Sequence, residues 1–416
     1  MNILRLKEIN EKIMNDEAVI LTAEELKAQV RDGKELTIED VDVVTTGTCG
    51  VMSGTAALLH FPVGEPGLFK RAKNVYLNGV PAYPGPCPNE WLGSVDAYVY
   101  GTSPSVSDSE YGGGFLFKDL IAGKKITVEV ESMDGDKYRS STSLDKMQTA
   151  KLIGSRVAFK NYTAFTNPNN TSVDSIFTNI PMSGPFDGLS FSGCGELNPL
   201  ANDPSLSTVF VGTKVLVNGA VGMVLGNGTR STGEKPNLMV VADMKNMREE
   251  YIGGFRTADG PDAFNTISLA VPVLDEDILS NLMVLDEDID IPVADIHGRH
   301  LPVSVTQYSE LWGDSDFRPE YDQSMCLECD ECSIEKACPT FAYNNGEYNS
   351  DDCYGCGYCA HYCKGNAFKM NTGKLEINTD QGTQKLKITC RQSDRQRAIK
   401  QMTQLKKIML QKQFPF

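Results

Sequence analysis

The chain has 416 residues, which is too long for one ordinary hydrophobic core, so two or three domains are expected. Its formal net charge of −16 argues against a nucleic acid as the partner, because binding phosphates requires a basic face. No apolar run is long enough to cross a membrane, and residues 1–15 lack the apolar stretch of a signal peptide. We therefore expect a cytoplasmic protein with reduced cysteines and no membrane partner.

The N-terminal region is expected to begin with two amphipathic helices, over residues 4–14 and 23–32. Thr22 is the expected N-cap of the second helix, since acidic residues follow it in the first turn. An apolar strand is expected at 41–45, and a stretch rich in small residues at 53–59 is expected to be helical.

The middle of the chain is expected to contain short strands separated by glycine-rich turns. The turns are expected at 112–114, 193–195 and 226–228. The strands are expected at 95–100, 126–130, 215–217, 222–225 and 238–242. Strands mixed with helices indicate an α/β or α+β body. Two acidic repeats at 273–278 and 284–289 are interpreted as solvated turns.

The expected domain organisation has four parts. A catalytic body spans 1–305, a linker spans 306–322, a ferredoxin-type domain spans 323–370, and a hairpin with a basic amphipathic helix spans 371–416.

The C-terminal part is expected to form a hairpin at 374–390, with Cys390 as a structural residue, and then a helix over 394–412 capped by Ser393. One face of this helix is basic, with Arg395, Arg397, Lys400, Lys406, Lys407 and Lys412. Two interpretations stay open: the helix packs on the acidic body, which is favoured, or it docks an acidic redox partner.

Eight of the twelve cysteines lie in two closely spaced runs that are typical of a two-cluster bacterial ferredoxin. The first run is Cys326, Cys329, Cys332 and Cys338, and the second is Cys353, Cys356, Cys359 and Cys363. Three thiolates at two-residue intervals can bind three corners of one iron–sulfur cube. The alternatives are zinc sites and disulfides, but zinc rarely uses this spacing and disulfides need an oxidising compartment.

The trailing cysteine of each run is expected to bind the cluster of the other run, as in two-cluster modules. This predicts two [4Fe-4S] clusters, one held by Cys326, Cys329, Cys332 and Cys363, and the other by Cys353, Cys356, Cys359 and Cys338. Five residues separate Cys332 from Cys338, a longer gap than usual, and Cys363 lacks the usual following proline.

Three further cysteines lie in glycine- or proline-rich loops and are the candidate catalytic residues: Cys49, Cys87 and Cys194. Cys49 is expected between a strand and a helix N-terminus, where backbone amides would stabilise its thiolate. The alternative for each is a small buried apolar residue. At least two of the three are expected to meet in one site.

Basic side chains in turns are the candidate anion-binding residues. Arg230, which lies among small hydroxyl residues, is the main candidate, and Arg156, Lys235 and Arg256 are further options. The alternative for each is a solvated surface residue. Walker, nucleophile-elbow and dinucleotide-binding motifs are absent from the sequence, so nucleotide-driven chemistry is not expected.

Several segments together resemble the archaeal homocysteine-biosynthesis (aspartate-semialdehyde sulfurtransferase) family. They are residues 44–54, 76–80, 112–114 and 198–204, and the resemblance covers most of residues 1–300. With the fused ferredoxin-type domain, Cys87 and Cys194, the chain looks most similar to the branch called methanogenesis marker 16 metalloprotein. One departure is that the homocysteine branch carries its cysteine near Ser53, whereas this chain has Cys49.

The resemblance implies the reductive conversion of an aldehyde to a thiol, with a sulfur donor and an external low-potential electron donor as partners. For this branch it implies the conversion of sulfoacetaldehyde to coenzyme M (2-mercaptoethanesulfonate), with Arg230 on the sulfonate. The alternative is homocysteine formation from aspartate semialdehyde. An alternative of another class is an electron carrier or assembly factor of a methanogen redox complex, which would not need the body cysteines. An oligomer is possible.

Overall fold

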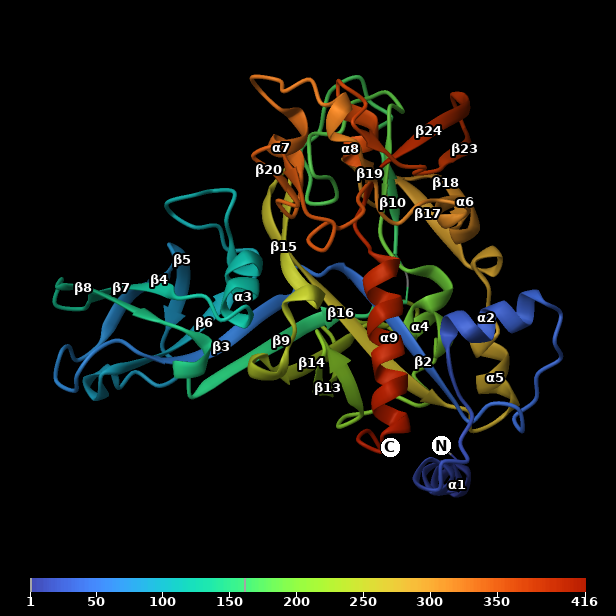
Figure 1. The fold of residues 1–416 in the computed structure, drawn as a ribbon, viewed down its shortest axis with the longest axis horizontal. Helices are drawn as coiled ribbons and strands as arrows, with labels where there is room; N and C mark the ends of the chain where they lie inside the picture. Colours follow the sequence, from blue (N-terminus) through green and yellow to red (C-terminus); the bar gives the residue numbers. More distant parts are fainter. Residues whose placement is uncertain (1, 161) are drawn as a thin grey trace.

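The protein combines a large antiparallel sheet with a smaller mixed sheet and a cysteine-rich segment. The computed structural model describes residues 2–160 and 162–416. Within them, one sheet has 14 strands and a second has six. Figure 1 shows the large sheet along the horizontal axis, with the second sheet and the cysteine-rich segment above its right-hand half. The expected mixture of helices and strands is confirmed.

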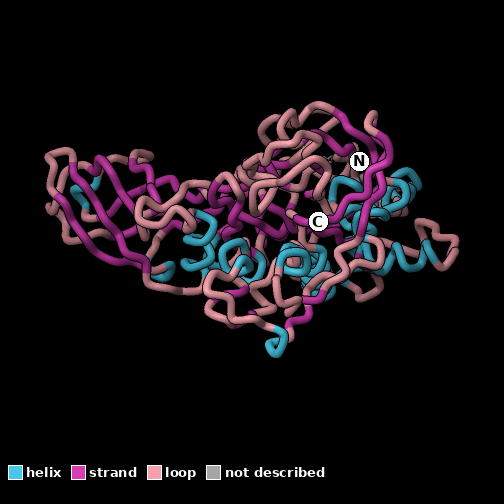
Figure 2. The backbone as a smooth tube through the Cα atoms, turned by 90° about the horizontal axis from the view of Figure 1, so that it is seen from above, coloured by secondary structure: helices cyan, strands magenta, loops and turns pink. Residues whose placement is uncertain are grey.

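The large sheet is antiparallel except for the pair of β1 and β2. Its strands, in sheet order, are β1 (Ile20–Thr22), β2 (Val43–Val51), β16 (Gly260–Pro272), β12 (Lys214–Val217), β13 (Ala220–Asn227), β14 (Leu238–Asp243), β9 (Thr149–Val157), β3 (Thr55–Pro62), β6 (Ser94–Tyr100), β5 (Val80–Pro84), β4 (Ala72–Leu77), β7 (Ile126–Ser132) and β8 (Lys137–Thr142), with β15 (Ile252–Thr257) paired to β16. Figure 2 shows that the end with β4, β5, β7 and β8 consists mainly of strands. The expected middle strands are confirmed as β6, β7, β12, β13 and β14.

The second sheet joins segments that are far apart in the sequence. Its order is β18 (Pro302–Gln307), β17 (Asp290–Asp295), β10 (Ala164–Thr166), β11 (Leu189–Phe191), β24 (Gly382–Arg391) and β23 (Lys374–Thr379). The predicted C-terminal hairpin is therefore correct and pairs with β11 of the body through β24. Two short ribbons complete the strands: β19 (Glu320–Tyr321) with β22 (Phe368–Lys369), and β20 (Tyr343–Asn344) with β21 (Glu347–Tyr348). The domain boundaries stay a prediction.

The helices lie mostly around the right-hand half of Figure 1. They are α1 (Ile3–Met14), α2 (Ala23–Arg31), α3 (Gly113–Ile121), α4 (Pro199–Asn202), α5 (Glu276–Leu282), α6 (Tyr308–Trp312), α7 (Ser333–Ala337), α8 (Tyr358–Tyr362) and α9 (Arg395–Leu410). Both N-terminal helices are confirmed, and Thr22 forms a capping box with Glu25. In the described part of the chain, no helix has both the length and the apolarity that a membrane crossing requires.

The segment after Cys49 forms a strand, so the helix expected at 53–59 is wrong. β2 continues to Val51, the chain reverses over residues 52–54, and β3 begins at Thr55. Along β3 buried and partly exposed residues alternate, which is the period of a strand. The small size of its residues concealed this two-residue pattern.

Two further expectations are corrected. The 112–114 segment opens α3 rather than forming a free turn, with Gly112 as its N-cap. In the second acidic repeat, Asp286 is not solvated. It is 5% exposed and forms an ion pair with Arg395 at 2.6 Å. The repeat therefore contributes to a buried contact between the body and α9.

The C-terminal helix α9 packs across β2 and β16, which confirms the packing interpretation of its basic face (Figure 1). Its N-cap is Asp394, not Ser393. Gly47 of β2 makes the close approach possible, because a Cβ there would lie 2.6 Å from the carbonyl oxygen of Ala398. Lys406 pairs with Glu25 at 2.6 Å and Lys412 with Asp16 at 2.8 Å, so acidic residues of the body neutralise the helix.

Candidate functional site

Two of the three candidate catalytic cysteines meet in the core. Cys49 lies on β2 opposite Thr266 of β16, and Cys194 lies between β11 and the 3₁₀ turn Gly195–Leu197. The Cys194 Sγ donates to the carbonyl oxygen of Cys49 at 3.6 Å. Both cysteines are fully buried. We call these two residues the thiol pair.

Burial controls the acidity of the thiol pair. Desolvation raises the pKa of Cys49, and the buried Asp394 carboxylate raises it further. Desolvation also raises the pKa of Cys194. The expected helix N-terminus is absent behind Cys49, since β3 follows it. In this state both cysteines are therefore neutral thiols.

Tyrosine and threonine side chains surround the thiol pair. Desolvation raises the pKa of Tyr162, and charge on Cys194 and Cys49 would raise it further. The Tyr162 hydroxyl and the Thr48 Oγ1 are buried without a hydrogen-bond partner within the described residues. Tyr308 donates to the carbonyl oxygen of Ser192 at 2.9 Å, which fixes the segment before Cys194. These two buried hydroxyl groups, of Tyr162 and Thr48, are thus available to hydrogen-bond a ligand.

Cys87 lies elsewhere. It is exposed in the loop between β5 and the 3₁₀ turn Glu90–Leu92, in the strand-rich end of the molecule (Figure 1). The structure therefore brings together Cys49 and Cys194 and leaves Cys87 apart from them.

The eight clustered cysteines line two cavities in the crossed arrangement that the spacing predicts. The inner quartet, which lines a cavity of about 390 Å³, is Cys338, Cys353, Cys356 and Cys359. The outer quartet, which lines a more open cavity of about 1160 Å³, is Cys326, Cys329, Cys332 and Cys363. All twelve cysteines of the chain are free. Within residues 2–160 and 162–416, no three or more His, Cys, Asp or Glu side chains are grouped to hold a single metal ion.

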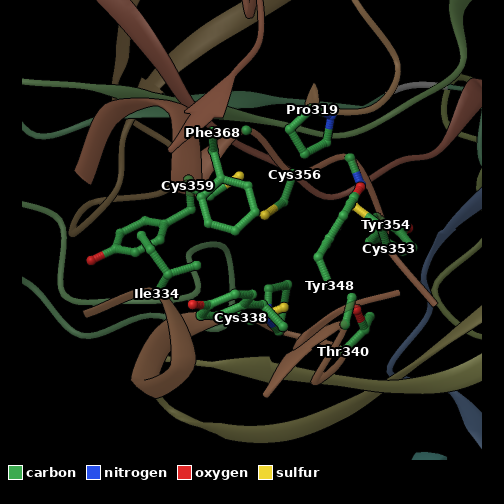
Figure 3. A pocket seen from close by; sticks show the side chains of 16 residues that line it. Pro319, Ile334, Cys338, Thr340, Tyr348, Cys353, Tyr354, Cys356, Cys359 and Phe368 are labelled. Atoms are coloured by element: carbon green, nitrogen blue, oxygen red, sulfur yellow. The ribbon is translucent and has the colours of Figure 1, made fainter. Parts of the chain in front are cut away.

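The inner quartet fits a multi-iron cube in its donor set and surroundings. Figure 3 shows the four cysteines around the cavity, with Tyr348, Phe368 and Ile334 among its other walls. Four thiolate donors in an apolar shell are the usual ligand set for a [4Fe-4S] cluster. Arg256 holds Cys338, the residue after the long gap, because its guanidinium donates to the Cys338 carbonyl oxygen at 2.6 Å. Arg256 is thus a structural residue rather than an anion receptor.

The inner quartet and the thiol pair share one core. Cys49, Cys194 and Cys356 belong to the same buried apolar cluster. Tyr354 follows Cys353 directly in the chain and is 1% exposed. Charge on Cys49 and Cys194 would raise the pKa of Tyr354, which is already raised by burial. Tyr354 donates to the carbonyl oxygen of Gln392 at 3.0 Å, and the same oxygen accepts from the Val51 N–H, two residues after Cys49. Tyr354 therefore connects the chain at Cys353 to the strand that carries Cys49.

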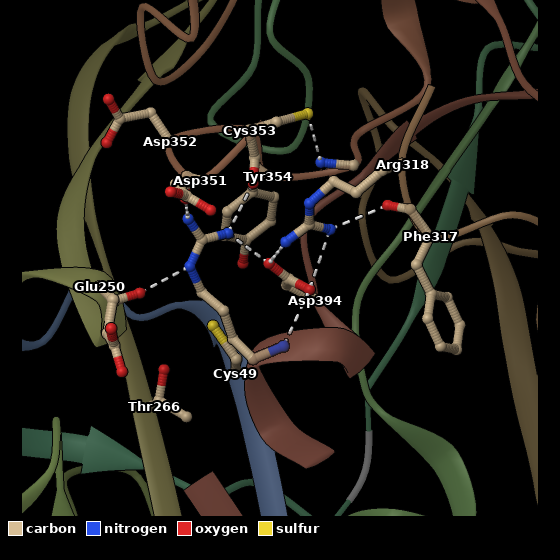
Figure 4. Close-up of polar contacts among 12 residues, drawn as sticks. Cys49, Glu250, Thr266, Phe317, Arg318, Asp351, Asp352, Cys353, Tyr354 and Asp394 are labelled. Atoms are coloured by element: carbon tan, nitrogen blue, oxygen red, sulfur yellow. Dashed lines mark hydrogen bonds and ion pairs between the residues drawn. The ribbon is translucent and has the colours of Figure 1, made fainter. Parts of the chain in front are cut away.

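A buried ion network fixes the same region, as Figure 4 shows. The Asp394 carboxylate pairs with Arg318 at 2.7 Å and with Arg397. The Asp394 N–H donates to the Cys49 carbonyl oxygen at 3.0 Å, and Arg397 donates to the Cys353 carbonyl oxygen at 2.7 Å. Burial alone would raise the pKa of Asp394, but the two arginines lower it below its usual value. The carboxylate is therefore charged and links the two sets of cysteines.

A large cavity of about 1480 Å³ lies beside the thiol pair and contains the predicted residue Arg230. Tyr162, Ser192 and Gln392 form part of its wall. Arg156 and Arg299 also line it, whereas its described lining includes no Asp or Glu. Desolvation and the charge of Arg230 lower the pKa of Arg156, and both side chains line this cavity. Such an arrangement favours an anion between them.

Sequence reasoning missed several of these residues. Tyr162, Arg299 and Asp394 lie in segments without a recognisable motif, and only the fold brings them to the site. Two signals were available: Tyr354 is adjacent to Cys353, and Asp394 precedes Arg397 by three residues at a helix start.

The fold and the site define a mixed α/β protein with a buried cysteine pair next to eight cysteines in two quartets. The chain belongs to the family described as homocysteine biosynthesis enzyme, sulfur-incorporation, whose model matches residues 18–416. This confirms the resemblance found in the sequence.

Comparison with curated proteins gives relatives of different kinds. An uncharacterised protein of Methanothermobacter thermautotrophicus is 50% identical over 404 residues, covering 97% of this chain and 92% of that protein. The L-aspartate semialdehyde sulfurtransferase of Methanocaldococcus jannaschii is 34% identical over 309 residues, covering 70% of this chain and 58% of that enzyme. The pyruvate synthase subunit PorD of Methanothermobacter marburgensis is 37% identical over 59 residues, covering 14% of this chain and 70% of the subunit. No solved structure matches.

Proposed function

We propose that the protein incorporates sulfur into an aldehyde and reduces the product to a thiol, with Cys49 and Cys194 as the sulfur-handling residues. Membership of the sulfur-incorporation family supports the reaction type. The observation that carries the proposal is the burial of the thiol pair in the same apolar core as Tyr354 and as Cys356 of the inner quartet.

The reaction requires both sulfur and electrons. An aldehyde and hydrogen sulfide give a thioaldehyde and water, and two electrons with two protons reduce the thioaldehyde to the thiol. When bound by the two quartets, [4Fe-4S] clusters supply electrons singly at low potential. The short match to the PorD subunit supports a ferredoxin-type module for this purpose.

The residues of the chain have separate tasks in this proposal. Cys49 adds to the aldehyde carbon to form a thiohemiacetal, and hydrogen sulfide then displaces the Cys49 sulfur and water is lost to give the thioaldehyde. Cys194 is the partner of Cys49, since the two are in contact. Because the thiolate is the reactive form, a proton must leave Cys49 when the sulfur donor or substrate enters. The Tyr162 hydroxyl, which is buried without a hydrogen-bond partner among the described residues, is the group that we assign to exchange that proton.

The arginine-lined cavity supports sulfoacetaldehyde as the substrate, with coenzyme M as the product. Three arginines suit a sulfonate, and the described lining offers no acid for an ammonium group. The Arg156 Nε is buried without a hydrogen-bond partner in the described residues, so it remains available to donate to such an anion. The substrate aldehyde thus carries an anionic group and no amine.

A second candidate is homocysteine formation from aspartate semialdehyde. The family description and the two relatives named L-aspartate semialdehyde sulfurtransferase favour it. Its substrate has an ammonium group as well as a carboxylate, and so requires a carboxylate partner that the described cavity lining lacks.

The deciding experiment is an anaerobic assay of the reconstituted protein with each aldehyde in parallel, together with sulfide and a strong one-electron reductant. We expect 2-mercaptoethanesulfonate from sulfoacetaldehyde. Homocysteine as the preferred product selects the second candidate. Absence of both thiols, with iron still bound, rejects the enzymatic proposal and favours an electron carrier.

A further inference from the structure

Arg391, at the end of β24, is fully buried beside the inner quartet. Its backbone N–H donates to the Cys356 carbonyl oxygen at 2.9 Å. Its guanidinium donates to the carbonyl oxygens of Asp316 at 2.6 Å and Thr372 at 2.9 Å. Its Nε has no hydrogen-bond partner among the described residues.

Arg391 differs from the neighbouring buried arginines in its lack of a carboxylate. Arg318 and Arg397 pair with Asp394, and Arg395 pairs with Asp286. Arg391 forms no ion pair in the part of the chain that the structure describes. Burying a cation without a counter-charge is costly, so an anion in its surroundings is expected.

The nearby anion is on the inner quartet. The backbone of Arg391 is hydrogen-bonded directly to the backbone of Cys356. Cys356 lines the inner cavity with the three other cysteines of its quartet. A cube held by four thiolates is anionic and gains a further negative charge on reduction, so a buried guanidinium favours the reduced form.

The outer quartet has the opposite surroundings. Its cavity is lined by three carboxylates, those of Glu328, Glu335 and Glu347, and by one exposed cation, Lys364. Carboxylates disfavour the addition of an electron. At the inner quartet, burial also disfavours the addition of an electron, and the positive charge of Arg391 offsets that cost.

We propose that Arg391 is the counter-charge of the inner [4Fe-4S] cluster and holds its reduction potential above that of the outer cluster. With clusters bound by both quartets, this order of potentials would favour single-electron transfer from an external one-electron donor through the outer quartet toward the inner quartet. The inference relies on the proposed function only for the presence of two clusters. In this proposal Arg391 does not touch the substrate; it is a positioning residue whose charge sets the reduction potential of the inner cluster.

The test is a redox titration of the reconstituted full-length protein without substrate, followed by electron paramagnetic resonance. Cys329→Ser, which alters the outer signal, and Cys359→Ser, which alters the inner signal, identify the two clusters. We expect the inner midpoint potential to be the higher. Arg391→Gln should shift only the inner midpoint to more negative values, and Arg391→Lys should restore most of the shift. Lys364→Gln is the control for an exposed cation and should move the outer midpoint far less.

Two results overturn the inference. One is an inner midpoint at or below the outer midpoint in the unmodified protein, which can be measured even if Arg391→Gln fails to bind iron. The other is an inner midpoint that does not change in Arg391→Gln. Since no aldehyde is present, neither result depends on the thiol-forming reaction, whose failure would appear only in the product assay.

Discussion

Cys49, Cys87 and Cys194 have similar glycine- or proline-rich surroundings in the sequence, yet the fold separates them sharply. Cys49 and Cys194 are in contact and fully buried, whereas Cys87 is exposed at the strand-rich end of the molecule. Local sequence can indicate that a cysteine lies in a constrained loop. It cannot indicate which loops meet, because the pairing of β2 with β16 and of β11 with β24 joins distant segments.

Replacement of the cysteines tests their separate roles. We expect Cys49→Ser to abolish thiol formation and Cys194→Ser to reduce it by at least about 100-fold, because each removes a group needed for sulfur transfer. Cys87→Ser is the matched control and should keep nearly full activity. Iron content, measured in parallel, separates loss of chemistry from loss of clusters. Undiminished product from Cys49→Ser would reject its assignment.

The arginines of the cavity should control substrate affinity more than turnover. Arg230→Gln removes a charge-assisted contact to an anion, worth about 1.5–3 kcal/mol. We therefore expect KM for the anionic aldehyde to rise about 10- to 100-fold with a smaller change in kcat. Arg230→Lys should be affected less, and Arg139→Gln, on exposed β8, should have no effect. An unchanged KM in Arg230→Gln and in Arg156→Gln would exclude the cavity as the substrate site.

At the scale of elements, strands and helices with a clear period were predictable and the segment after Cys49 was not. The two N-terminal helices, the five middle strands and α9 have strong apolar patterns. Residues 55–61 are, apart from His60, small or apolar residues that suit either a helix or a strand, and their pairing with β6 and β9 makes them a strand. The N-cap of α9 was missed by one residue because Ser393 and Asp394 are both good caps.

The first turn of α9 is held by the Asp394 network, which should matter for stability. Asp394→Asn keeps a capping side chain but leaves Arg318 and Arg397 without their buried carboxylate. We expect unfolding free energy to fall by about 3–5 kcal/mol, measured by denaturant titration of iron-loaded protein. Asp380→Asn, in the exposed β23–β24 turn, is the control and should change it by less than about 0.5 kcal/mol. Equal stability of the two variants would show that the network is unimportant.

At the scale of the whole molecule, the crossed arrangement of the two cysteine runs makes a specific prediction for iron content. Cys338→Ser should remove the inner cluster, although Cys338 belongs to the first run, and Cys363→Ser should remove the outer one. Iron should fall from about eight to about four per chain in each variant. Loss of the outer signal from Cys338→Ser would show uncrossed ligation.

The grouping of the eight cysteines into two crossed quartets could be predicted from spacing alone, because ligand geometry restricts spacing tightly. The sheet order could not, since strands as distant as 189–191 and 382–391 pair in it. The cavity beside the thiol pair was also beyond prediction. Its three arginines come from separate segments, at 156, 230 and 299, and no local pattern connects them.

The position of α9 over β2 has a consequence for biogenesis. Residues 43–51 leave the ribosome long before residues 395–410. More than three hundred further residues must therefore be synthesised before α9 can pack over the strand with Cys49. The intervening residues include both cysteine quartets. The Cys49 side chain of the nascent chain is thus covered only after the segment with both cysteine quartets has been synthesised, so burial of the thiol pair and completion of the quartets belong to the same late stage of folding.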